Sequence, residues 1–247
     1  MIHIVIPMAG HGSRFANAGY KMPKPLIDIW GHYMVEYVIH NIRPSQEYQF
    51  IFLCLKEHLE KYQLREKLQQ IEPNSKIVEV SEVTKGAACT VLLAQEYIDN
   101  DDPLMIANSD QYVTIDIDDY LSKMEGKDGL IMTMEANDPK WSFIAYNEEK
   151  NVTLVREKEV ISDEATVGIY CFSHGSDFVK YANQMIEKDI RVNHEFYVAP
   201  VYNEMIEDDK KITFYNIGSL DHGMYGLGVP EDLEKFKTHS FSKEIFQ

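Results

Sequence analysis

The sequence predicts an α/β fold in which a Rossmann-like, mixed but mainly parallel sheet is flanked by helices. Two apolar runs, His3–Met8 and Phe50–Leu55, are continuous, as expected of strands buried on both faces. Segments with helical spacing alternate with such runs through the first half, and this alternation is typical of parallel pairing with right-handed crossovers. At 247 residues with no linker composition, the chain is expected to form one domain.

The first half is expected to alternate strands and helices. Strands are predicted at 3–8, 27–30, 49–55, 76–80, 103–108 and 129–134, and helices at 34–42, at 58–69 and from the segment 81–88 to Tyr97. The carboxyl ends of parallel strands meet at one edge of a sheet, where ligands bind. Gly10, Ser81 and Asp110 each follow such a strand, so we expect them at that edge.

The second half is expected to be more mixed. Short strands at 143–146, 152–156 and 166–172 predict a smaller antiparallel element beside the sheet, followed by helices at 176–187 and 198–206, a strand at 212–216 and a helix from Pro230. Apolar positions on the 176–187 helix suit either a homodimer contact or the core.

Charge and cysteine content limit the function. The chain has 24 Lys and Arg against 40 Asp and Glu, a net charge of −16. Such a surface repels nucleic acid and anionic membranes, so any anion site must be local. Cys54, Cys89 and Cys171 lack CxxC spacing and are predicted to be buried free thiols. With a strand at the N-terminus and no long apolar run, we expect a cytoplasmic enzyme.

A small-residue loop follows the first strand and is the main candidate site. It runs Ala9, Gly10, His11, Gly12, Ser13, Arg14, Phe15. Glycines allow main-chain N–H groups to approach an anion, and Arg14 and Lys24 supply positive charge. We interpret the loop as a triphosphate cradle with Arg14 and Lys24 as catalytic groups. An ordinary turn is the simpler alternative. A dinucleotide fingerprint fits less well, because Phe15 replaces its third glycine and no helix pattern starts there.

Four segments carry a resemblance to a known family. They are IPMAGHGSRFANAGYKMPKPLIDIW, NSDQYV, HEFYVAPVYNEMI and MYGLGVPEDLEKF. They resemble the nucleotidyltransferases that join a nucleoside triphosphate to a phosphorylated small molecule. The resemblance implies a fold of GT-A type, with a nucleotide-binding half at 1–135 and an acceptor-binding half at 136–247. It also implies Mg²⁺, CTP as the donor and a phosphorylated acceptor, with L-glutamine phosphate favoured over a sugar.

The resemblance also implies roles for individual residues. Asp110, in NSDQYV, corresponds to a metal ligand, as expected of a carboxylate at a strand end facing phosphate. The nucleotide would contact the loop Ala9, Gly10, His11, Gly12, Ser13 and Arg14 together with Lys24, and its base would contact Ser81, Gly86 and Ala87. The acceptor would contact Trp141, Ser142, Glu157, Lys158, Gly168 and Glu195.

One position departs from the family pattern. Gly226 stands where a second metal carboxylate is expected. Either Asp221 or Glu195 would replace it, or Asp110, phosphate oxygens and water would hold the ion.

Four functions remain open at this point. The first is a cytidylyltransferase in which the acceptor phosphate attacks the α-phosphorus, a reaction that needs no protein nucleophile because a phosphomonoester is largely dianionic near neutral pH. The others are a sugar-1-phosphate enzyme using UTP, dTTP or CTP, a glycosyltransferase of related architecture, and a nucleotide-binding regulator.

Overall fold

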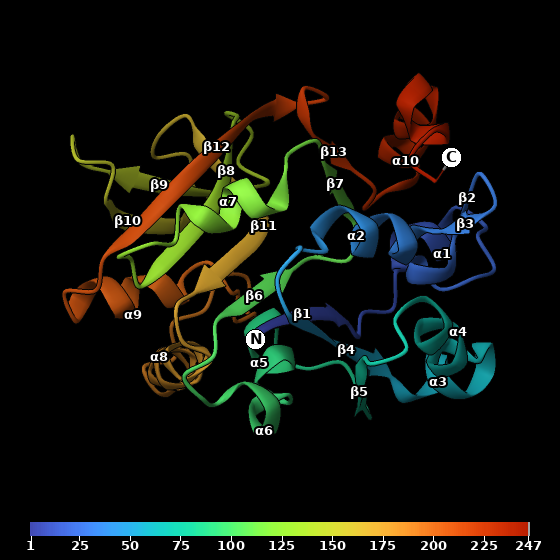
Figure 1. Cartoon of the computed structure of the whole chain (residues 1–247), viewed down its shortest axis with the longest axis horizontal. Helices are drawn as coiled ribbons and strands as arrows, with labels where there is room; N and C mark the ends of the chain where they lie inside the picture. Colours follow the sequence, from blue (N-terminus) through green and yellow to red (C-terminus); the bar gives the residue numbers. More distant parts are fainter. Residues whose placement is uncertain (247) are drawn as a thin grey trace.

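The computed structural model describes residues 1–246 (Figure 1). The strands are β1 Ile2–Met8, β2 Asp28–Ile29, β3 His32–Tyr33, β4 Tyr48–Leu55, β5 Lys76–Val80, β6 Leu104–Ala107, β7 Gln111–Val113, β8 Gly129–Glu135, β9 Ser142–Tyr146, β10 Val152–Glu157, β11 Glu164–Phe172, β12 Ile212–Leu220 and β13 Gly223–Gly226. The helices are α1 Ser13–Asn17, α2 Met34–Ile42, α3 Lys56–Tyr62, α4 Leu64–Ile71, α5 Ala87–Leu92, α6 Gln95–Ile98, α7 Ile117–Ser122, α8 Gly175–Glu187, α9 Val201–Glu207 and α10 Pro230–Thr238, with short 3₁₀ turns η1 Lys24–Leu26 and η2 Ser240–Lys243.

One large mixed sheet contains most of the strands. Its order is β5-β4-β1-β6-β11-β8-β12-β13-β7, and β9 and β10 extend it from β11 as a small antiparallel unit. Strands β5, β4, β1 and β6 are parallel, as are β8, β12 and β13. The predicted α/β class is therefore confirmed. The prediction of an antiparallel element lying only beside the sheet was incomplete, because β11 lies inside the sheet, antiparallel to both β6 and β8.

Each face of the sheet buries its own core. Alternate residues of a strand point to opposite faces. On β1, Ile4 and Ile6 pack with α2 and α7 on one face, whereas Val5 packs with α5, α8 and α9 on the other. Helices thus cover both faces of the sheet. Because β1 and β4 are buried on both sides, their sequences are continuously apolar.

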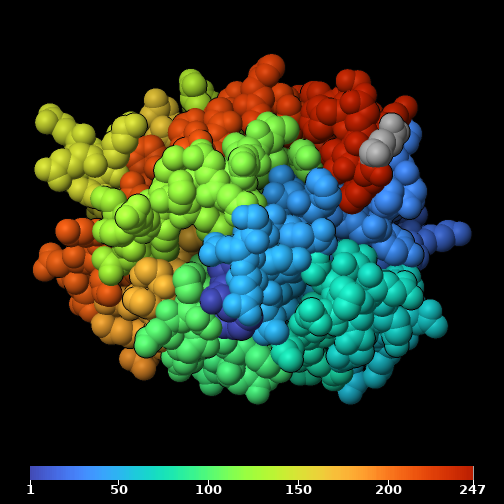
Figure 2. All heavy atoms as spheres, viewed as in Figure 1, coloured from blue at the N-terminus to red at the C-terminus, as the bar shows by residue number. Residues whose placement is uncertain are grey.

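A third cluster joins the two ends of the chain. Phe15 of α1, Tyr37 of α2 and Phe236 of α10 pack together, with Tyr225 of β13 and the partly buried Phe246. Figure 1 places α10 beside α1 and the β2-β3 hairpin, and in Figure 2 the C-terminal residues in red lie against the N-terminal residues in blue. The loop after β1 is therefore supported by C-terminal residues.

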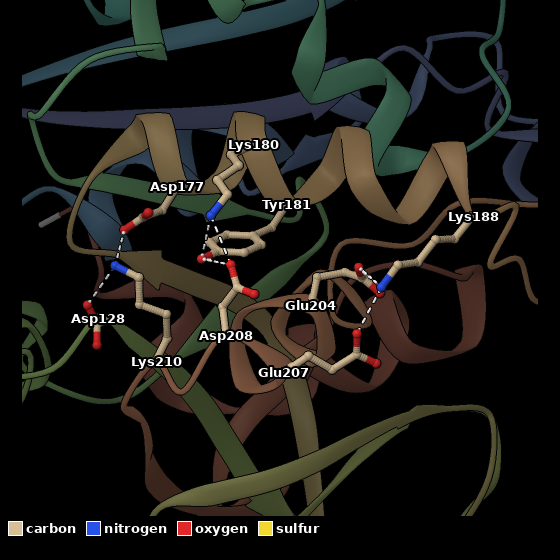
Figure 3. Close-up of polar contacts among 9 residues, drawn as sticks. All are labelled: Asp128, Asp177, Lys180, Tyr181, Lys188, Glu204, Glu207, Asp208 and Lys210. Atoms are coloured by element: carbon tan, nitrogen blue, oxygen red, sulfur yellow. Dashed lines mark hydrogen bonds and ion pairs between the residues drawn. The ribbon is translucent and has the colours of Figure 1, made fainter.

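Helix α8 is fixed to its neighbours by three lysines (Figure 3). Lys180 pairs with Asp208, Lys188 with Glu204 and Glu207, and Lys210 with Asp128 and Asp177. The apolar side of α8, which includes Phe178, Tyr181 and Met185, is buried in the core. The apolar side of α8 therefore belongs to the core, one of the two possibilities left open by the sequence.

Several predicted element boundaries were wrong for local reasons. The predicted 58–69 helix is two helices, α3 and α4, because Gln63 adopts a left-handed conformation with φ 53°. The helix expected to run to Tyr97 is divided into α5 and α6 around Leu93 and Ala94. A one-turn helix, α1, does begin at Ser13, although no helix was predicted there. The three-residue strand β7 was too short to be recognised.

The prediction of three buried free thiols was correct for two of the cysteines and wrong for Cys89. All three cysteines are free within residues 1–246; Cys54 and Cys171 are buried and Cys89 is partly exposed. Burial raises the pKa of the Cys54 and Cys171 thiols to about 12. None of the described helices is long and apolar enough to cross a membrane.

Candidate functional site

The loop after β1 bends back over the carboxyl edge of the sheet. Gly12 has φ 62° and precedes α1, and a Cβ at this position would lie 3.5 Å from Cβ of Lys24. Ala9 is buried, whereas Gly10, His11, Ser13 and Arg14 are exposed. The left-handed turn at Gly12 brings the loop against the Lys24 segment, so the two halves of the predicted cradle are neighbours.

Lys24 and Asp110 form an ion pair at this edge. Nζ of Lys24 donates a hydrogen bond to Oδ2 of Asp110 at 2.8 Å, and the two side chains are 23% and 28% exposed. Asp110 follows β6, the parallel neighbour of β1, so the ends of adjacent strands bring the two charges together. The predicted convergence of the β1 loop and Asp110 is thus present in the structure.

The Asp110 side chain packs closely against Gly228. A Cβ at Gly228 would lie 2.8 Å from Oδ2 of Asp110, and N–H of Leu227 donates to the Asp110 carbonyl at 2.8 Å. The carboxylate is partly exposed and is paired with Lys24, and a carboxylate at this edge suits a hard cation. Mg²⁺ takes one or two carboxylates and completes its shell with phosphate oxygens and water, so these residues fit it.

The replacements proposed for the second carboxylate lie in other surroundings. Asp221 forms an ion pair with Lys235, and Glu195 lies on the wall of a separate cavity. Gly226 faces Asp232 of α10. A Cβ at Gly226 would lie 3.0 Å from Oδ2 of Asp232. Within residues 1–246 no group of three or more His, Cys, Asp or Glu side chains is arranged to hold a metal. Of the three carboxylates considered from the sequence, Asp110 is thus the one paired with Lys24 beside the β1 loop.

The predicted base-binding residues divide into two groups. Ser81 is exposed just after β5, and Ala87 lines a cavity at the same edge. Gly86, with φ 132°, lies against the main chain of Phe196: a Cβ there would be 2.4 Å from the Phe196 carbonyl oxygen. The Gly86 carbonyl already accepts hydrogen bonds from Thr84 and Thr90. The close approach expected at Gly86 is therefore made by protein.

A cavity of about 200 Å³ brings the predicted acceptor residues together. Trp141, Ser142, Glu157 and Gly168 line it, and Ala87 forms part of the same wall. The wall also contains residues that were not predicted: Asn108, Lys140, Thr166, Tyr170, Tyr197, Val198 and Ala199. The cavity thus adjoins the antiparallel strands and the donor loop, which we define as residues 81–87 with the predicted base-binding positions.

Glu157 gives this cavity a carboxyl group that is shielded from water. Burial raises its pKa, while a hydrogen bond from the Ser142 hydroxyl and the charge of Lys158 act in the opposite direction. Tyr170 is buried nearby, and its hydroxyl lies 2.9 Å from Oγ1 of Thr166. The cavity therefore offers several hydrogen-bonding groups to a small polar molecule.

Gly168 serves a protein contact as well as the cavity. Its φ is 83°, and a Cβ would lie 2.1 Å from Nδ2 of Asn108. The Asn108 N–H also donates to the Gly168 carbonyl at 2.9 Å. The glycine predicted to lie against substrate is thus needed first for the packing of Asn108 onto β11.

The last two predicted acceptor residues lie beside the cavity. Nζ of Lys158 donates to the Tyr197 hydroxyl at 2.6 Å, and this bond raises the lysine pKa. Glu195 is exposed and lines a second cavity of about 110 Å³, which shares Glu157 and Tyr197 with the first. Tyr197 was missed because nothing in its spacing indicates a role; only its place two residues after Glu195, in HEFYVAPVYNEMI, pointed to this region.

Taken together, the edge combines a glycine turn, cationic side chains, one carboxylate and a polar cavity. Arg14, Lys24 and Lys158 are separate positive groups in a chain with a net charge of −16. Such an arrangement can neutralise several phosphoryl groups and hold a small phosphorylated molecule next to them.

Comparison with known proteins agrees with this chemistry. A sequence profile described as nucleotidyl transferase matches residues 4–220. A nucleoside-diphosphate-sugar pyrophosphorylase structure from Vibrio cholerae RC9 is 27% identical, covers 96% of this chain and 100% of its own, and has a TM-score of 0.83.

Two further solved structures share the fold at lower identity. A proposed glucose-1-phosphate thymidylyltransferase from Bacillus anthracis, in complex with sucrose, is 15% identical, with 99% of this chain and 96% of its own covered and a TM-score of 0.78. The inositol-1-phosphate CTP transferase from T. maritima is 13% identical, with 98% and 94% covered and a TM-score of 0.74.

Proposed function

The chain belongs to the nucleotidyl transferase family, and we propose that it is a CTP:phosphoglutamine cytidylyltransferase. In this reaction CMP is transferred from CTP to L-glutamine phosphate, giving CDP-L-glutamine and pyrophosphate for phosphoramidate modification of a capsular polysaccharide in the cytoplasm. The resemblance of the four segments over nearly the whole length supports this choice of substrates. The single observation that supports the reaction type is the Lys24–Asp110 pair beside the Gly12 turn.

In the proposed reaction an oxygen of the acceptor phosphate attacks the α-phosphorus of CTP in line with the leaving group. A new P–O bond forms as the bond from the α-phosphorus to the bridging oxygen breaks, and the electron pair leaves with pyrophosphate. No proton has to be removed from the nucleophile, because the acceptor phosphate is already ionised near neutral pH. The protein's task is orientation and charge neutralisation.

Each basic residue has a separate role in this proposal. Arg14 and Lys24 bind the triphosphate from the loop side, and Lys158 holds the acceptor phosphate beside the cavity. The backbone of residues 9–13 approaches the phosphates where Gly10 and Gly12 leave space. Asp110 would hold Mg²⁺, which when bound neutralises phosphate charge.

For the acceptor, the proposal places the non-phosphate part of the molecule in the cavity. Ser142, Glu157 and Tyr170 offer hydrogen bonds there, and Trp141 offers an apolar wall. Three observations favour glutamine phosphate: Ser142 stands where sugar enzymes of the family tend to carry glycine, Trp141 precedes it, and Gly226 departs from the family pattern. Ser81 and Ala87 would contact the base.

A sugar-1-phosphate nucleotidyltransferase using CTP, UTP or dTTP is the second candidate. It is favoured by the 27% identity over 96% of the chain to a nucleoside-diphosphate-sugar pyrophosphorylase.

Pyrophosphate release, measured over a panel of nucleotides and acceptor phosphates with Mg²⁺ present, separates the candidates. Release with CTP and L-glutamine phosphate supports the proposal. Release with a sugar-1-phosphate supports the second candidate. If no pair of substrates releases pyrophosphate, both candidates are contradicted, and a glycosyltransferase or a regulator is favoured.

A further inference from the structure

The segment Glu195–Tyr197 lies between the donor loop and the acceptor lysine. N–H of Phe196 donates to the Lys85 carbonyl at 2.8 Å, and N–H of Ala88 donates to the Phe196 carbonyl at 3.0 Å. Gly86, between these two hydrogen bonds, has no side chain, and a Cβ there would lie 2.5 Å from the Phe196 nitrogen. The main chain at Phe196 is thus fixed directly against the loop that carries Ala87.

The next residue makes the contact to Lys158. The Tyr197 hydroxyl accepts a hydrogen bond from Nζ of Lys158 at 2.6 Å, and that nitrogen is 4.8 Å from the centre of the Tyr197 ring. The Lys158 main chain is also fixed, with φ 59° and its N–H donating to the Trp141 carbonyl at 3.0 Å. Both ends of the lysine are therefore held, the backbone by Trp141 and the ammonium by Tyr197.

We propose that Tyr197 is a positioning residue that holds the Lys158 ammonium for the acceptor phosphate, and that Phe196 fixes Tyr197 relative to the donor loop. A free lysine side chain loses much rotamer entropy on binding, so holding it in advance lowers the cost of binding a phosphate. This inference rests on the proposed function only in assigning the acceptor phosphate to Lys158.

The position of Tyr197 separates this role from simple packing. The side chain is half-buried and lines both cavities. Replacing Tyr197 by phenylalanine removes the hydroxyl and keeps the ring over the ammonium, so the variant tests the hydrogen bond without opening the core.

The experiment measures binding of inorganic phosphate, as a probe for the acceptor's phosphoryl group, by titration calorimetry of the full chain. Tyr197→Phe is expected to raise the phosphate Kd by about 3- to 10-fold, the net effect of one typical intramolecular hydrogen bond. Lys158→Met should raise it at least as much. In the Lys158→Met background, Tyr197→Phe should add nothing, because it acts through that lysine.

A matched control is Tyr146→Phe, at an exposed tyrosine of β9 away from Lys158, which should leave the Kd unchanged. Equal effects of Tyr197→Phe with and without Lys158 would overturn the inference, since a merely structural role gives that result. An unchanged Kd in Tyr197→Phe overturns it as well, as does a wild-type protein that binds phosphate no better than Lys158→Met.

A second variant tests the link to the donor loop. Gly86→Ala must displace the Phe196 main chain, so it should raise the phosphate Kd in the same direction; an unchanged Kd contradicts the part of the inference that concerns Phe196. Phosphate binding requires neither CTP nor glutamine phosphate. Failure of this inference is therefore distinguishable from failure of the proposed function, which pyrophosphate release tests.

Discussion

Nζ of Lys24 lies 2.8 Å from Oδ2 of Asp110, so the phosphate-binding lysine and the metal-binding carboxylate of the proposed site neutralise each other when no substrate is bound. Each charge thereby has a partner until the triphosphate arrives. Binding of the donor must exchange this ion pair for contacts to phosphate.

We expect Lys24→Met and Asp110→Asn each to lower turnover by about 100-fold or more, the size of effect seen when one charge-stabilising group is lost. The free energy of unfolding should change by only about 1 kcal/mol or less, because the pair is partly exposed. Initial rates of pyrophosphate release and urea unfolding measure the two effects. Lys123→Met, which removes an exposed pair with Asp119, is the control and should keep full turnover.

Arg14→Ala should also lower turnover by about 100-fold without changing the melting temperature. Arg14 is exposed on α1, and its guanidinium forms no ion pair among the described residues, so folding does not depend on it. Arg65→Ala, which removes an arginine from α4, is the matched control. Near-normal turnover in Arg14→Ala would remove this residue from the proposed catalytic set.

Two neighbouring glycines should respond differently to substitution. In Gly228→Ala the new methyl group would lie 2.8 Å from the Asp110 carboxylate and displace it, so Mn²⁺ binding in the presence of CTP should weaken about 10-fold or more. In Gly226→Ala the methyl group would meet the Asp232 side chain instead, at 3.0 Å from Oδ2 and 3.5 Å from Cβ. Equal Mn²⁺ affinities in the two variants, measured by electron paramagnetic resonance, would contradict the assignment of Asp110.

Glu157 should make stability depend on pH. Burial raises its pKa above the ordinary value of 4.5, so the folded protein binds this proton more tightly than the unfolded chain. Stability from this group is therefore fully present below pH 4.5 and is lost as the pH rises through the folded pKa.

Glu157→Gln removes this dependence. Its melting temperature, relative to wild type, should rise as the pH is increased above 4.5 in a series of thermal melts. Glu148→Gln, at an exposed position, should follow the wild-type curve throughout. A constant difference between Glu157→Gln and wild type over the series would argue against a buried carboxyl group.

The lysines of Figure 3 should differ in their effect on stability. Lys188 pairs with Glu204, which is only 2% exposed, whereas Lys180 pairs with Asp208, which is 48% exposed. Lys188→Ala leaves a buried carboxylate without its partner and should lower the melting temperature more than Lys180→Ala. The opposite order would show that Glu204 is not stabilised by this contact.

Features determined by local pattern were predictable from the sequence. The buried strands β1 and β4 were visible as apolar runs, and Asp110 was found because it directly follows a predicted strand. The β1 loop and Asp110 could be placed together because parallel strands share a carboxyl edge.

The remaining features depend on contacts between distant parts of the chain. The positive φ of Gly86 suits a close approach, but the sequence does not indicate that Phe196 is the partner. Likewise Tyr197 gains its role only because β10 brings Lys158 beside it. The break at Gln63 was also hidden, since no glycine or proline marks it.

The cluster of Phe15, Tyr37 and Phe236 has a consequence for synthesis of the protein. Because α10 follows all the described strands in the sequence, the support beneath the loop that precedes α1 is complete only after α10 has left the ribosome. The proposed CTP-binding site is therefore completed late, after most of the sheet is already available to fold.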